Sequence, residues 1–529
     1  MRLIPMLTFL LVLASTAQAA DETVERKGLS ATELSAYVDQ LTSQGQIISD
    51  LRVRVVERKA VFDVTAEPNR DKRAWLIQVN ISDKEFRDAK KRYSDDGFKN
   101  TIHRASERSG ELHSTIWVQK TENIELLKLP AGSVPVTGEL GKNLEPINEL
   151  LLKTLMDNNI PGATLAVARD GIIVYERGFG YSDLEQQTRM AANTTLRIAS
   201  ISKPITAVAV LLLVDDGKLK LDDYVIDYLV RDKKFALPKD ADPAWSRVTI
   251  RHLLQHSGGW NRDKSKDPMF ELLAISRAME LKQLARIPDI VRYQLSRSLD
   301  FEPGTEHQYS NFGYCLLGRV IEAASGQPYA SFVTERILKP AGMLGTRLGK
   351  TRLADRADDE AHYYTQTLKT YPAIWDAAHA GKSGKFELVQ APYGQSDLEV
   401  MDSHGAWTST ASDLVRFAAA MDSGTKPLLK PDTLRQLRER PAFAGSDADT
   451  WYGLGWNVRS IKGLDRVSMW HTGQLAGTST ILVKRWDNFV WAVLFNVDET
   501  KDGNKCATLI HGPIHMAVDG SLAFMEPGE

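Results

Sequence analysis

The sequence predicts a protein of the α+β class, because amphipathic helix patterns and strand-like runs both recur along its 529 residues. Two local signals support this class. Capping boxes, in which a serine and a glutamate three residues later satisfy each other's backbone groups at a helix start, stand at Ser30/Glu33 and Ser82/Glu85. An Asp-Gly turn at 170–171 separates the strand-like runs ATLAVA and IIVYERGFG, which is typical of a β-hairpin.

The composition is that of a globular protein. Hydrophobic residues make up 43% and charged residues 25%, which excludes a collagenous, coiled-coil or mostly disordered chain. The 66 Lys+Arg and 68 Asp+Glu give a net charge of −2, so charge gives no reason to expect nucleic acid or an anionic membrane as partner. Two cysteines are too few for a disulfide-dense scaffold or a four-cysteine zinc site. At roughly 100–200 residues per domain, we expect two or three domains.

Residues 1–19 are predicted to be a signal peptide. A basic start, an apolar stretch at 3–14 and the Ala-x-Ala sequence Ala17-Gln18-Ala19 are the parts of such a leader. The stretch is too short to span a bilayer comfortably as a permanent helix, and an uncleaved N-terminal anchor is the alternative. We therefore expect a secreted or periplasmic protein without stable membrane insertion after cleavage. Disulfides are permitted in that compartment, and pairing of Cys315 with Cys506 is left open.

Residues 20–125 are predicted to form a tandem repeat of two helix-plus-strands units. The segments 29–45 and 81–97 match from the capping box to a final glycine, the residue best suited to a left-handed helix end. Strand-like runs follow each helix, and the run RAWLIQVN lies between the two units. We favour a docking or stabilising module, with binding to cell wall or substrate as the alternative.

Residues 126–142, which contain several prolines and glycines, are predicted to be a linker, and 143–529 to form one larger domain. Its first motif is Ser200-x-x-Lys203, at the start of an apolar helix. Pro204 fits only in the first turn of that helix, so Ser200 is expected at the N-terminus with Lys203 one turn on. A serine hydroxyl is a poor nucleophile until a base takes its proton, and burial pushes a lysine toward its neutral, basic form.

Two further motifs carry candidate chemistry. Tyr309-Ser310-Asn311 follows a Pro-Gly turn and precedes an apolar helix. A cationic lysine nearby would lower the tyrosine pKa enough for a proton relay, and Asn311 can bind a substrate amide. His471-Thr472-Gly473 lies in a strand-like run, where a glycine lets a substrate backbone approach closely. The backbone N–H groups of Gln474 and Ser200 can form an oxyanion hole.

The order of these motifs, S-x-x-K, Y-x-N and H-T-G, resembles the serine β-lactamase and penicillin-binding-protein superfamily, in particular its class C-like esterase and D-peptidase branch. The resemblance begins near residue 145 and continues to the C-terminus. It includes three further stretches, LLQHSGGW (253–260), HGAWTSTASDLVRFAAAM (404–421) and YGLGW (452–456). The N-terminal units resemble small tandem repeats found ahead of serine hydrolase domains in secreted proteins.

The resemblance implies Ser200 as the acylated nucleophile, with Lys203 and Tyr309 as the proton-transfer pair. It implies Asn311 as a substrate-orienting amide, and the strand through His471–Gln474 as the wall that pairs with substrate. The implied fold is an α/β sandwich, a mostly antiparallel sheet with helices on both faces. A helical subdomain is expected between the first and third motifs.

The third motif departs from the family pattern, in which Lys-Thr-Gly is usual. Here His471 replaces the lysine, and histidine is largely neutral at pH 7. Recognition of a β-lactam or D-alanyl carboxylate is therefore weakened, and the same replacement is common among the family's esterases and non-lactamase peptidases. Gln474 replaces a second glycine often present there. His256 matches a recurrent structural turn, and we expect no catalytic role for it.

We expect an exported serine hydrolase that cleaves an ester or amide bond, including a peptide bond, through an acyl-enzyme on Ser200. A β-lactamase or D-Ala-D-Ala carboxypeptidase is the alternative within the fold. A non-catalytic cell-wall-binding or sensor protein is the alternative of another class. The partner is expected to be a small ester, amide or peptide, with cell-wall origin left open, and not nucleic acid. No metal or cofactor is implied, because the histidines lack zincin-like spacing and this mechanism needs none.

Overall fold

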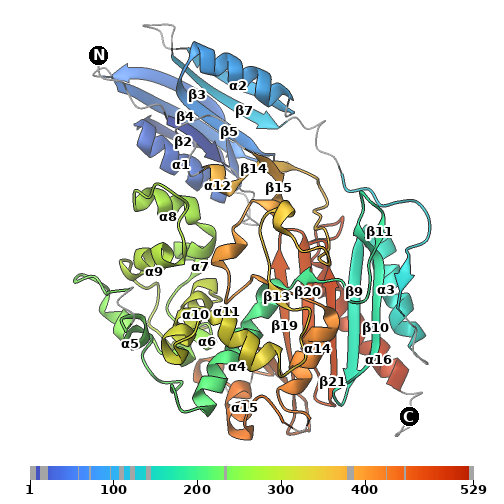
Figure 1. Cartoon of the computed structure of the whole chain (residues 1–529). Coiled ribbons are helices and arrows are strands. Elements are labelled where there is room, and N and C mark those ends of the chain that lie inside the picture. Colours follow the sequence, from blue (N-terminus) through green and yellow to red (C-terminus); the bar gives the residue numbers. More distant parts are fainter. Residues whose placement is uncertain are drawn as a thin grey trace. The chain divides into compact units, whose positions relative to one another are not determined.

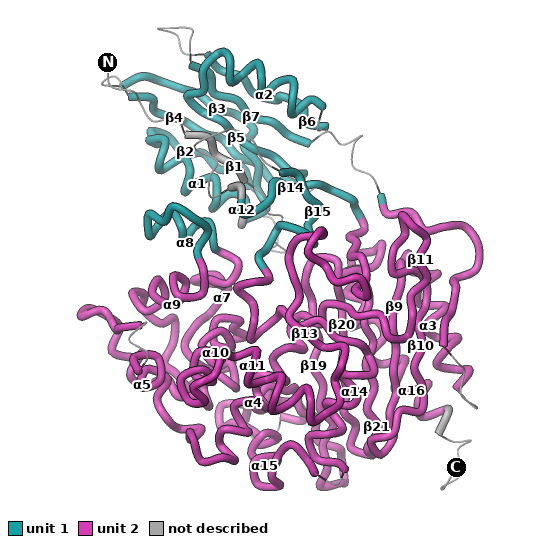
Figure 2. The backbone as a smooth tube through the Cα atoms, viewed as in Figure 1, with its two compact units in different colours: residues 1–126, 272–285, 367–397 teal, residues 127–271, 286–366, 398–529 magenta. Residues whose placement is uncertain are grey.

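Figure 1 shows the computed structural model of the chain. It describes residues 7–11, 22–56, 59–70, 73–95, 97–105, 112–119, 126–138, 144–231, 235–377, 387–424, 426–445 and 448–522. The chain divides into two compact units, which Figure 2 colours separately. Unit 1 consists of Met1–Leu126, Leu272–Ala285 and Thr367–Asp397, and unit 2 of Leu127–Glu271, Arg286–Gln366 and Leu398–Glu529.

Unit 1 contains two successive modules with the same order of elements, strand-helix-strand-strand. The first consists of β2 (Val24–Leu29), α1 (Ala31–Ser43), β3 (Gln46–Val56) and β4 (Lys59–Pro68). The second consists of β5 (Trp75–Ser82), α2 (Asp83–Asp95), β6 (Phe98–Ala105) and β7 (Leu112–Gln119). In both modules the last strand lies between the other two, in the orders β2-β4-β3 and β5-β7-β6. Equal order and equal pairing are what two copies of one ancestral module would produce.

Both predicted capping boxes are confirmed. Ser30 N–H donates to Glu33 Oε2 (2.8 Å) while Glu33 N–H donates to Ser30 Oγ (3.2 Å). Ser82 and Glu85 repeat the exchange at 2.7 and 3.3 Å. RAWLIQVN does not lie between the modules, because it supplies β5 of the second one. Its counterpart β2 reads VERKGL, which carries too many charges to be recognised as a strand from its pattern.

Two later segments also belong to unit 1, although the sequence suggested residues 20–125 alone. They contribute α8 (Leu272–Ala278), β14 (Thr370–Pro372), α12 (Ile374–Ala377) and β15 (Leu388–Gln390). Arg277 of α8 forms an ion pair with Asp39 of α1. A surface ion pair and a short hairpin have no periodic signal, so sequence patterns cannot reveal such an association.

The predicted linker and the predicted signal peptide each contain a described strand. In the predicted linker, β8 (Val136–Thr137) pairs with a strand of unit 2, so this part of 126–142 belongs to the larger sheet. At the N-terminus, β1 (Leu7–Leu11) pairs with β5. The remainder of the predicted signal peptide lies outside the described residues, and the leader stays a prediction.

Unit 2 is organised around an antiparallel sheet with the strand order β11-β10-β9-β21-β20-β19-β18-β17. Its bounds are β9 (Gly162–Arg169), β10 (Ile172–Asp183), β11 (Thr188–Arg189), β17 (Thr450–Tyr452), β18 (Asn457–Ser460), β19 (Val467–Leu475), β20 (Thr478–Lys484) and β21 (Phe489–Phe495). The predicted hairpin joins β9 to β10, where Asp170 and Gly171 have φ angles of 50° and 82°. Two positive φ angles define the turn type that Asp-Gly favours.

Helices cover both faces of this sheet, as expected from the resemblance (Figure 1). Every residue of β20 and β21 is buried. Helix α14 (Ala411–Ala420) packs on β9 and β21, while α16 (Cys506–Leu522) packs on β20 and β21 with α3 (Glu145–Asn158) against it. The chain between the motifs forms the helical region, with α4 (Ser202–Asp215), α5 (Val225–Leu229), α6 (Ile250–Leu254), α7 (Arg262–Ser265), α9 (Ile287–Leu295), α10 (Asn311–Ser325) and α11 (Tyr329–Val333).

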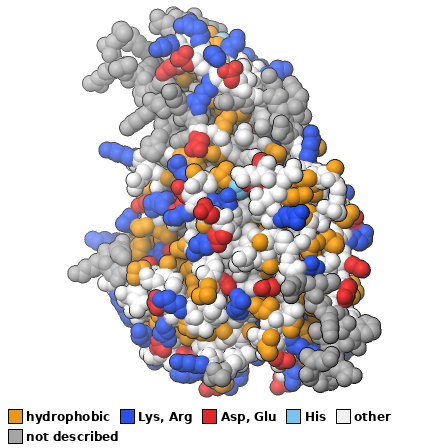
Figure 3. Space-filling model, turned by 45° about the vertical axis from the view of Figure 1, so that its right-hand side comes forward, with side chains coloured by type: hydrophobic (Ala, Val, Ile, Leu, Met, Phe, Trp, Pro, Cys, Tyr) orange, Lys and Arg blue, Asp and Glu red, His pale blue; other side chains and the backbone are white. Residues whose placement is uncertain are grey.

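The cysteines, the apolar helices and the surface charges each relate to an expectation from the sequence. Cys315 and Cys506 are both free and buried, so they are not paired with each other. Among the described residues, no helix combines the length and apolar character that crossing a membrane requires. On the face drawn in Figure 3, basic, acidic and apolar side chains are intermixed, in keeping with the near-zero net charge.

Gly473 lets β19 lie directly against the turn that carries Ser200. A Cβ at this position would collide with the carbonyl oxygen of Ile198 and with Thr480 Oγ1, and would crowd Ala199 Cβ. The sequence suggested that this glycine makes room for a substrate backbone. The structure shows that it makes room for the chain itself.

Gly473→Ala is therefore expected to lower the free energy of unfolding by about 1–3 kcal/mol, the usual cost of overpacking a core. Urea denaturation of the full chain measures this. The control is Gly520→Ala in α16, where an added Cβ meets nothing within 4 Å. Its expected change is stabilisation by at most about 1 kcal/mol. Equal stability of Gly473→Ala and the wild type would contradict the packing described here.

Candidate active site

Ser200 lies in a strained turn in front of a helix. The 3-10 turn Ala199–Ile201 leads directly into α4, so Ser200 precedes the helix as predicted. Ala199 has a φ of 46°, a left-handed conformation that residues with a Cβ seldom adopt. Such strain persists only where the surroundings hold it, and it gathers at functional sites. Ser200 itself is half-buried, so its hydroxyl is accessible at the edge of a packed core.

Lys203, one turn further on, directs its amine at Ser200. Its Nζ lies 2.9 Å from Ser200 Oγ, 2.7 Å from Asn311 Oδ1 and 3.0 Å from the carbonyl oxygen of His404. The side chain is completely buried. Burial lowers the pKa of Lys203 well below its usual value, and the positive charge of Arg262 lowers it further, against the opposing effect of Asp267.

The three contacts are compatible with a neutral Lys203, the form that the lowered pKa favours. An uncharged amine has two N–H groups and one lone pair. The two N–H groups donate to Asn311 Oδ1 and to the His404 carbonyl, which can only accept. The lone pair is then left for the hydroxyl proton of Ser200. Lys203 is thus arranged as a general base for this serine.

Tyr309 contacts the same serine but differs from expectation in its pKa. Its hydroxyl donates to Ser200 Oγ over 2.8 Å. Burial raises the pKa of Tyr309 above its usual value, and this outweighs the hydrogen bond to Ser200 and the charge of Arg262. The expected lowering by a cationic lysine is wrong, because the lysine is itself driven toward neutrality by the same burial. Tyr309 is a neutral phenol that donates to Ser200 rather than a phenolate.

Asn311 is held at both ends of its amide by the chain itself. It is the first residue of α10, whose N-cap Ser310 accepts from Gly313 N–H (3.0 Å). Its Oδ1 accepts from Lys203, and its Nδ2 donates to Asp267 Oδ2 over 2.7 Å. Sequence reasoning assigned Asn311 to substrate orientation. In the structure its amide orients Lys203, and the carboxylate of Asp267 determines which end of the amide faces the lysine.

His471 is buried on β19 and uncharged. Burial is the largest cause that lowers the pKa of His471 to about 3. Its Nδ1 lies 2.7 Å from the carbonyl oxygen of Thr472, to which it can only donate. The other nitrogen, Nε2, therefore accepts from the hydroxyl of Tyr452 at 3.0 Å. The position where the family usually has a lysine thus holds a neutral imidazole.

The remaining predicted binding residues follow on the same strand. Residues 471–475 pair with β20 on one side, while the pairing of β19 with β18 ends at Trp470. Among the described strands, none pairs with the other side of this stretch, which leaves an open edge beside Ser200. The side chain of Thr472 is exposed, and Gln474 donates from Nε2 to the carbonyl of Asp498 (3.1 Å). An oxyanion hole formed by the Gln474 and Ser200 backbone N–H groups stays a prediction.

His256 contacts Ser310 and Tyr309 of the second motif, in keeping with the structural role expected for it. Its Nδ1 accepts from Ser310 N–H (3.1 Å), and its ring lies 4.3 Å from the ring of Tyr309. Three contributors were not found from sequence: Asp267, the His404 carbonyl and Tyr452. His404 and Tyr452 begin stretches that belong to the resemblance, which was the signal available for them. Asp267 begins an Asp-Pro turn with no distinguishing pattern.

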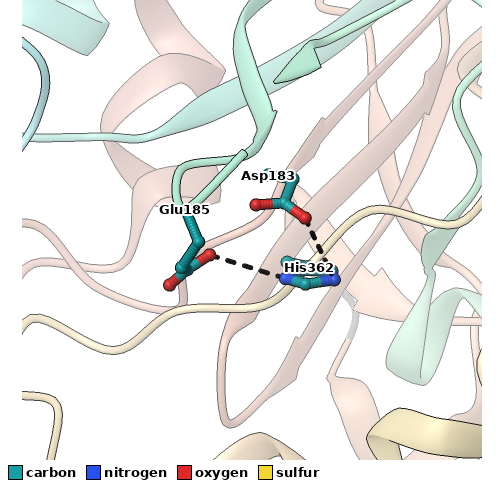
Figure 4. Close-up of side chains that lie close together, drawn as sticks. All are labelled: Asp183, Glu185 and His362. Carbon is teal, nitrogen blue, oxygen red and sulfur yellow. Dashed lines mark ion pairs between the residues drawn. The ribbon is translucent and has the colours of Figure 1, made fainter. Parts of the chain in front are cut away.

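One cluster of potential metal ligands occurs among the described residues, and it includes none of the residues that contact Ser200 (Figure 4). His362 faces Asp183 with Nε2 (3.4 Å) and Glu185 with Nδ1 (3.6 Å). Opposite nitrogens of one ring cannot bind the same ion, so these contacts describe an imidazole between two carboxylates. Tyr364 also donates to Glu185 Oε2 (2.6 Å) and occupies that carboxylate further.

A serine whose hydroxyl contacts a buried lysine amine and a tyrosine, at the edge of an antiparallel sheet covered by helices, is the constellation of a serine hydrolase. The profile of the beta-lactamase family matches residues 148–512, and the chain belongs to that family. It is 30% identical over 348 residues to Penicillin-binding protein 4* of Bacillus subtilis, covering 64% of this chain and 69% of that protein. It is 37% identical over 194 residues to Esterase EstB of Burkholderia gladioli, covering 36% and 48%.

Solved structures confirm the fold. The hydrolase EstCE1 aligns with a TM-score of 0.55 at 22% identity, covering 71% of this chain and 98% of that one. D-amino acid amidase from Ochrobactrum anthropi aligns with a TM-score of 0.54 at 22% identity, covering 72% and 100%. The octameric penicillin-binding protein homologue from Pyrococcus abyssi aligns at 0.52 and 22%, covering 70% and 77%. The fold predicted from the motifs is therefore correct.

The lowered pKa of Lys203 predicts the pH dependence of activity. Because protonation removes the lone pair, kcat/KM should fall as pH decreases through the pKa of Lys203 and stay level above it. The midpoint is expected well below 10.5, the ordinary lysine value. His471, with a pKa of about 3, does not produce this limb. The profile is measured with p-nitrophenyl acetate after subtraction of spontaneous hydrolysis. In Lys203→Arg, whose side chain stays charged, kcat/KM should be about 10²–10⁴-fold lower than in the wild type. A decline of kcat/KM with a midpoint near pH 10.5 in the wild type would contradict the assignment.

Asp267→Asn tests the positioning of Asn311. Asp267 accepts from Asn311 with one oxygen and from Met269 N–H with the other (3.1 Å), and an asparagine has a single acceptor. We expect kcat to fall about tenfold with KM little changed, the scale of one hydrogen bond to a charged group. The acid limb should also move to lower pH, because the charge of Asp267 raises the pKa of Lys203. The exposed Asp263→Asn is the control, and an unmoved limb in Asp267→Asn would argue against the assignment.

Proposed function

We propose that this serine hydrolase is exported and cleaves an ester or amide bond of a small substrate through an acyl-enzyme on Ser200. The observation that carries the proposal is the contact of Ser200 Oγ with both Lys203 Nζ (2.9 Å) and Tyr309 Oη (2.8 Å). One partner can take the hydroxyl proton and the other can donate to the same oxygen. The two partners therefore supply opposite halves of acid–base catalysis around one nucleophile.

In the proposed reaction, Ser200 Oγ attacks the substrate carbonyl carbon while its proton moves to Lys203 Nζ. The carbonyl π electrons move to oxygen, where backbone N–H groups are expected to stabilise the negative charge. The bond to the leaving alcohol or amine then breaks, and a proton passes from Lys203 to that group, through Tyr309 where its hydroxyl lies nearer. Water completes the cycle by the same steps, releasing the carboxylic acid and restoring Ser200.

The substrate class follows from the charge near the third motif. His471 has a pKa lowered to about 3, so it gives no fixed cation to a substrate carboxylate at neutral pH. An ester or amide that needs no carboxylate for recognition fits this environment better than a β-lactam or D-alanyl peptide. The open edge at 471–475 offers backbone groups for an extended, peptide-like substrate. An esterase and an amidase are among the similar proteins.

A second candidate is hydrolysis of a carboxylate-bearing substrate, as in a β-lactamase or a D-Ala-D-Ala carboxypeptidase. The observation that favours it is Arg262, whose guanidinium lies 5.4 Å from the centre of the Tyr309 ring. Its side chain is exposed, and its charge also acts on the nearby Asp267. Arg262 can therefore replace the missing lysine as the cation that faces a substrate carboxylate.

Export rests on the N-terminal sequence, with a basic start, an apolar stretch and Ala17-Gln18-Ala19. We place the mature chain in the periplasm or outside the cell, with residue 20 as its first. The neutral surface charge gives no attraction to nucleic acid. A cell-wall-derived ester, amide or peptide is a substrate that such a location would make accessible.

Intact-mass spectrometry after mixing with substrate tests the proposal. We expect an acyl adduct on Ser200 with p-nitrophenyl esters or D-peptide esters and amides, and slower labelling by nitrocefin. Ser200→Ala should form no adduct and lose at least about 10³-fold in hydrolysis. The same spectra report the mature N-terminus, expected at Ala20 in exported protein.

The outcomes separate the candidates. Nitrocefin turnover faster than ester turnover, abolished in Arg262→Gln, would favour the carboxylate-bearing substrates. Wild-type hydrolysis by Ser200→Ala, or no labelling of Ser200 by a fluorophosphonate, would rule out the acyl-enzyme. A mass that retains residues 1–19 after export would contradict the leader.

A further inference from the structure

Unit 2 contains a cavity that none of the catalytic residues line and that no catalytic step uses. It has a volume of about 320 Å³, which lies in the range of small-molecule sites. The cavity lies where α16 meets the outer strands β18–β20. Its lining includes the aromatic side chains of Trp470, Trp486, His511 and His515, together with two arginines and Asp519. Trp470 and His511 are 5.6 Å apart between ring centres, and His511 and His515 are 5.3 Å apart.

The cavity lies on the opposite side of the sheet from the catalytic serine. Trp470 and His471 are consecutive residues of β19, and consecutive side chains of a strand point to opposite faces. His471 belongs to the active site, and Trp470 faces α16. Trp470 is also the last residue of β19 that pairs with β18. A ligand in this cavity would therefore not compete with substrate for space.

The cavity contains one cation without an acidic partner. Arg459 is exposed, and its guanidinium lies 5.3 Å from the centre of the Trp470 ring. Among the described residues no carboxylate lies within ion-pair distance of it. Arg485, the other arginine of the wall, is neutralised by Asp487 (2.7 Å) and Asp519 (2.6 Å). An incoming anion would therefore pair with Arg459, next to an aromatic face.

The two histidines add neutral polar groups. Burial lowers the pKa of His511, and burial with the positive charge nearby lowers that of His515 to about 4. His515 Nδ1 lies 3.5 Å from the Arg485 guanidinium, which can only donate, so Nε2 of His515 carries the proton. His515 therefore offers an N–H donor to a ligand without adding a positive charge to the cavity wall at neutral pH.

We propose that this cavity is a binding site for a small aromatic carboxylate. Its ring packs against the tryptophan and histidine rings that line the cavity, and its carboxylate pairs with Arg459. An aromatic lining and the Arg459 guanidinium, which is outside any ion pair among the described residues while Asp519 is paired with Arg485, together select this chemistry over a neutral ring or an aliphatic acid. The site is additional to the catalytic one and does not depend on the identity of the substrate.

Isothermal titration calorimetry on the full-length Ser200→Ala protein tests the site. The probes are benzoate, 2-naphthoate and indole-3-acetate, with 2-naphthamide as the uncharged analogue. At least one carboxylate should bind, with 2-naphthamide at least about tenfold weaker than 2-naphthoate, the scale of one charge-assisted hydrogen bond. Arg459→Gln should weaken carboxylate binding about tenfold, and Trp470→Leu should weaken all three probes.

The matched control is Arg466→Gln. Arg466 lies 5.8 Å from the centre of the Trp486 ring but outside the cavity wall, so its loss should leave binding unchanged. When Arg459→Gln is made in the protein that retains Ser200, the variant should hydrolyse p-nitrophenyl acetate at the wild-type rate. Absence of binding by all three carboxylates, equal binding of 2-naphthoate and 2-naphthamide, or unweakened binding by Arg459→Gln would overturn the proposal. If Trp470→Leu does not fold, carboxylate binding by Arg459→Gln alone tests the proposal, because position 459 is exposed.

Discussion

The burial of the Lys203 amine is the constraint on which the rest of the site depends. Removing a charged ammonium from water costs free energy, so burial lowers the pKa of the amine well below its usual value. The surroundings are arranged to keep it buried yet hydrogen-bonded. Asn311 and the His404 carbonyl take its two N–H groups, and Asp267 holds the asparagine. The lone pair of the neutral amine then faces Ser200, and the lowered pKa leaves more of the amine in the form that can accept the serine proton.

The same burial explains the other ionisable groups of the site. Tyr309 keeps its proton and donates to Ser200, while His471 loses its own and accepts from Tyr452. The site therefore packs a base, a neutral acid and a neutral imidazole together. The fold delivers these groups from three distant segments, and Gly473 allows the strand of the third to touch the turn of the first.

Sequence patterns predicted those features that depend only on neighbouring residues. Ser200, Lys203 and Pro204 together define a helix start, and the Asp-Gly hairpin and both capping boxes need only neighbouring residues. Properties created by tertiary packing were not accessible in this way. The raised pKa of Tyr309 depends on burial, the partner of Asn311 is an aspartate 44 residues away, and Gly473 is required by a carbonyl of another segment. The segments that join unit 1 from within the larger domain likewise have no periodic signal.

The protonation state of Lys203 is the central claim, and NMR measures it without reference to any substrate. In protein labelled with ¹³C at lysine Cε, the resonance that disappears in Lys203→Met belongs to Lys203, and its shift is followed against pH. The account predicts a titration midpoint well below the ordinary value of 10.5. A midpoint at or above 10.5 would mean that the amine is charged at neutral pH, and Lys203 could not then act as the base for Ser200.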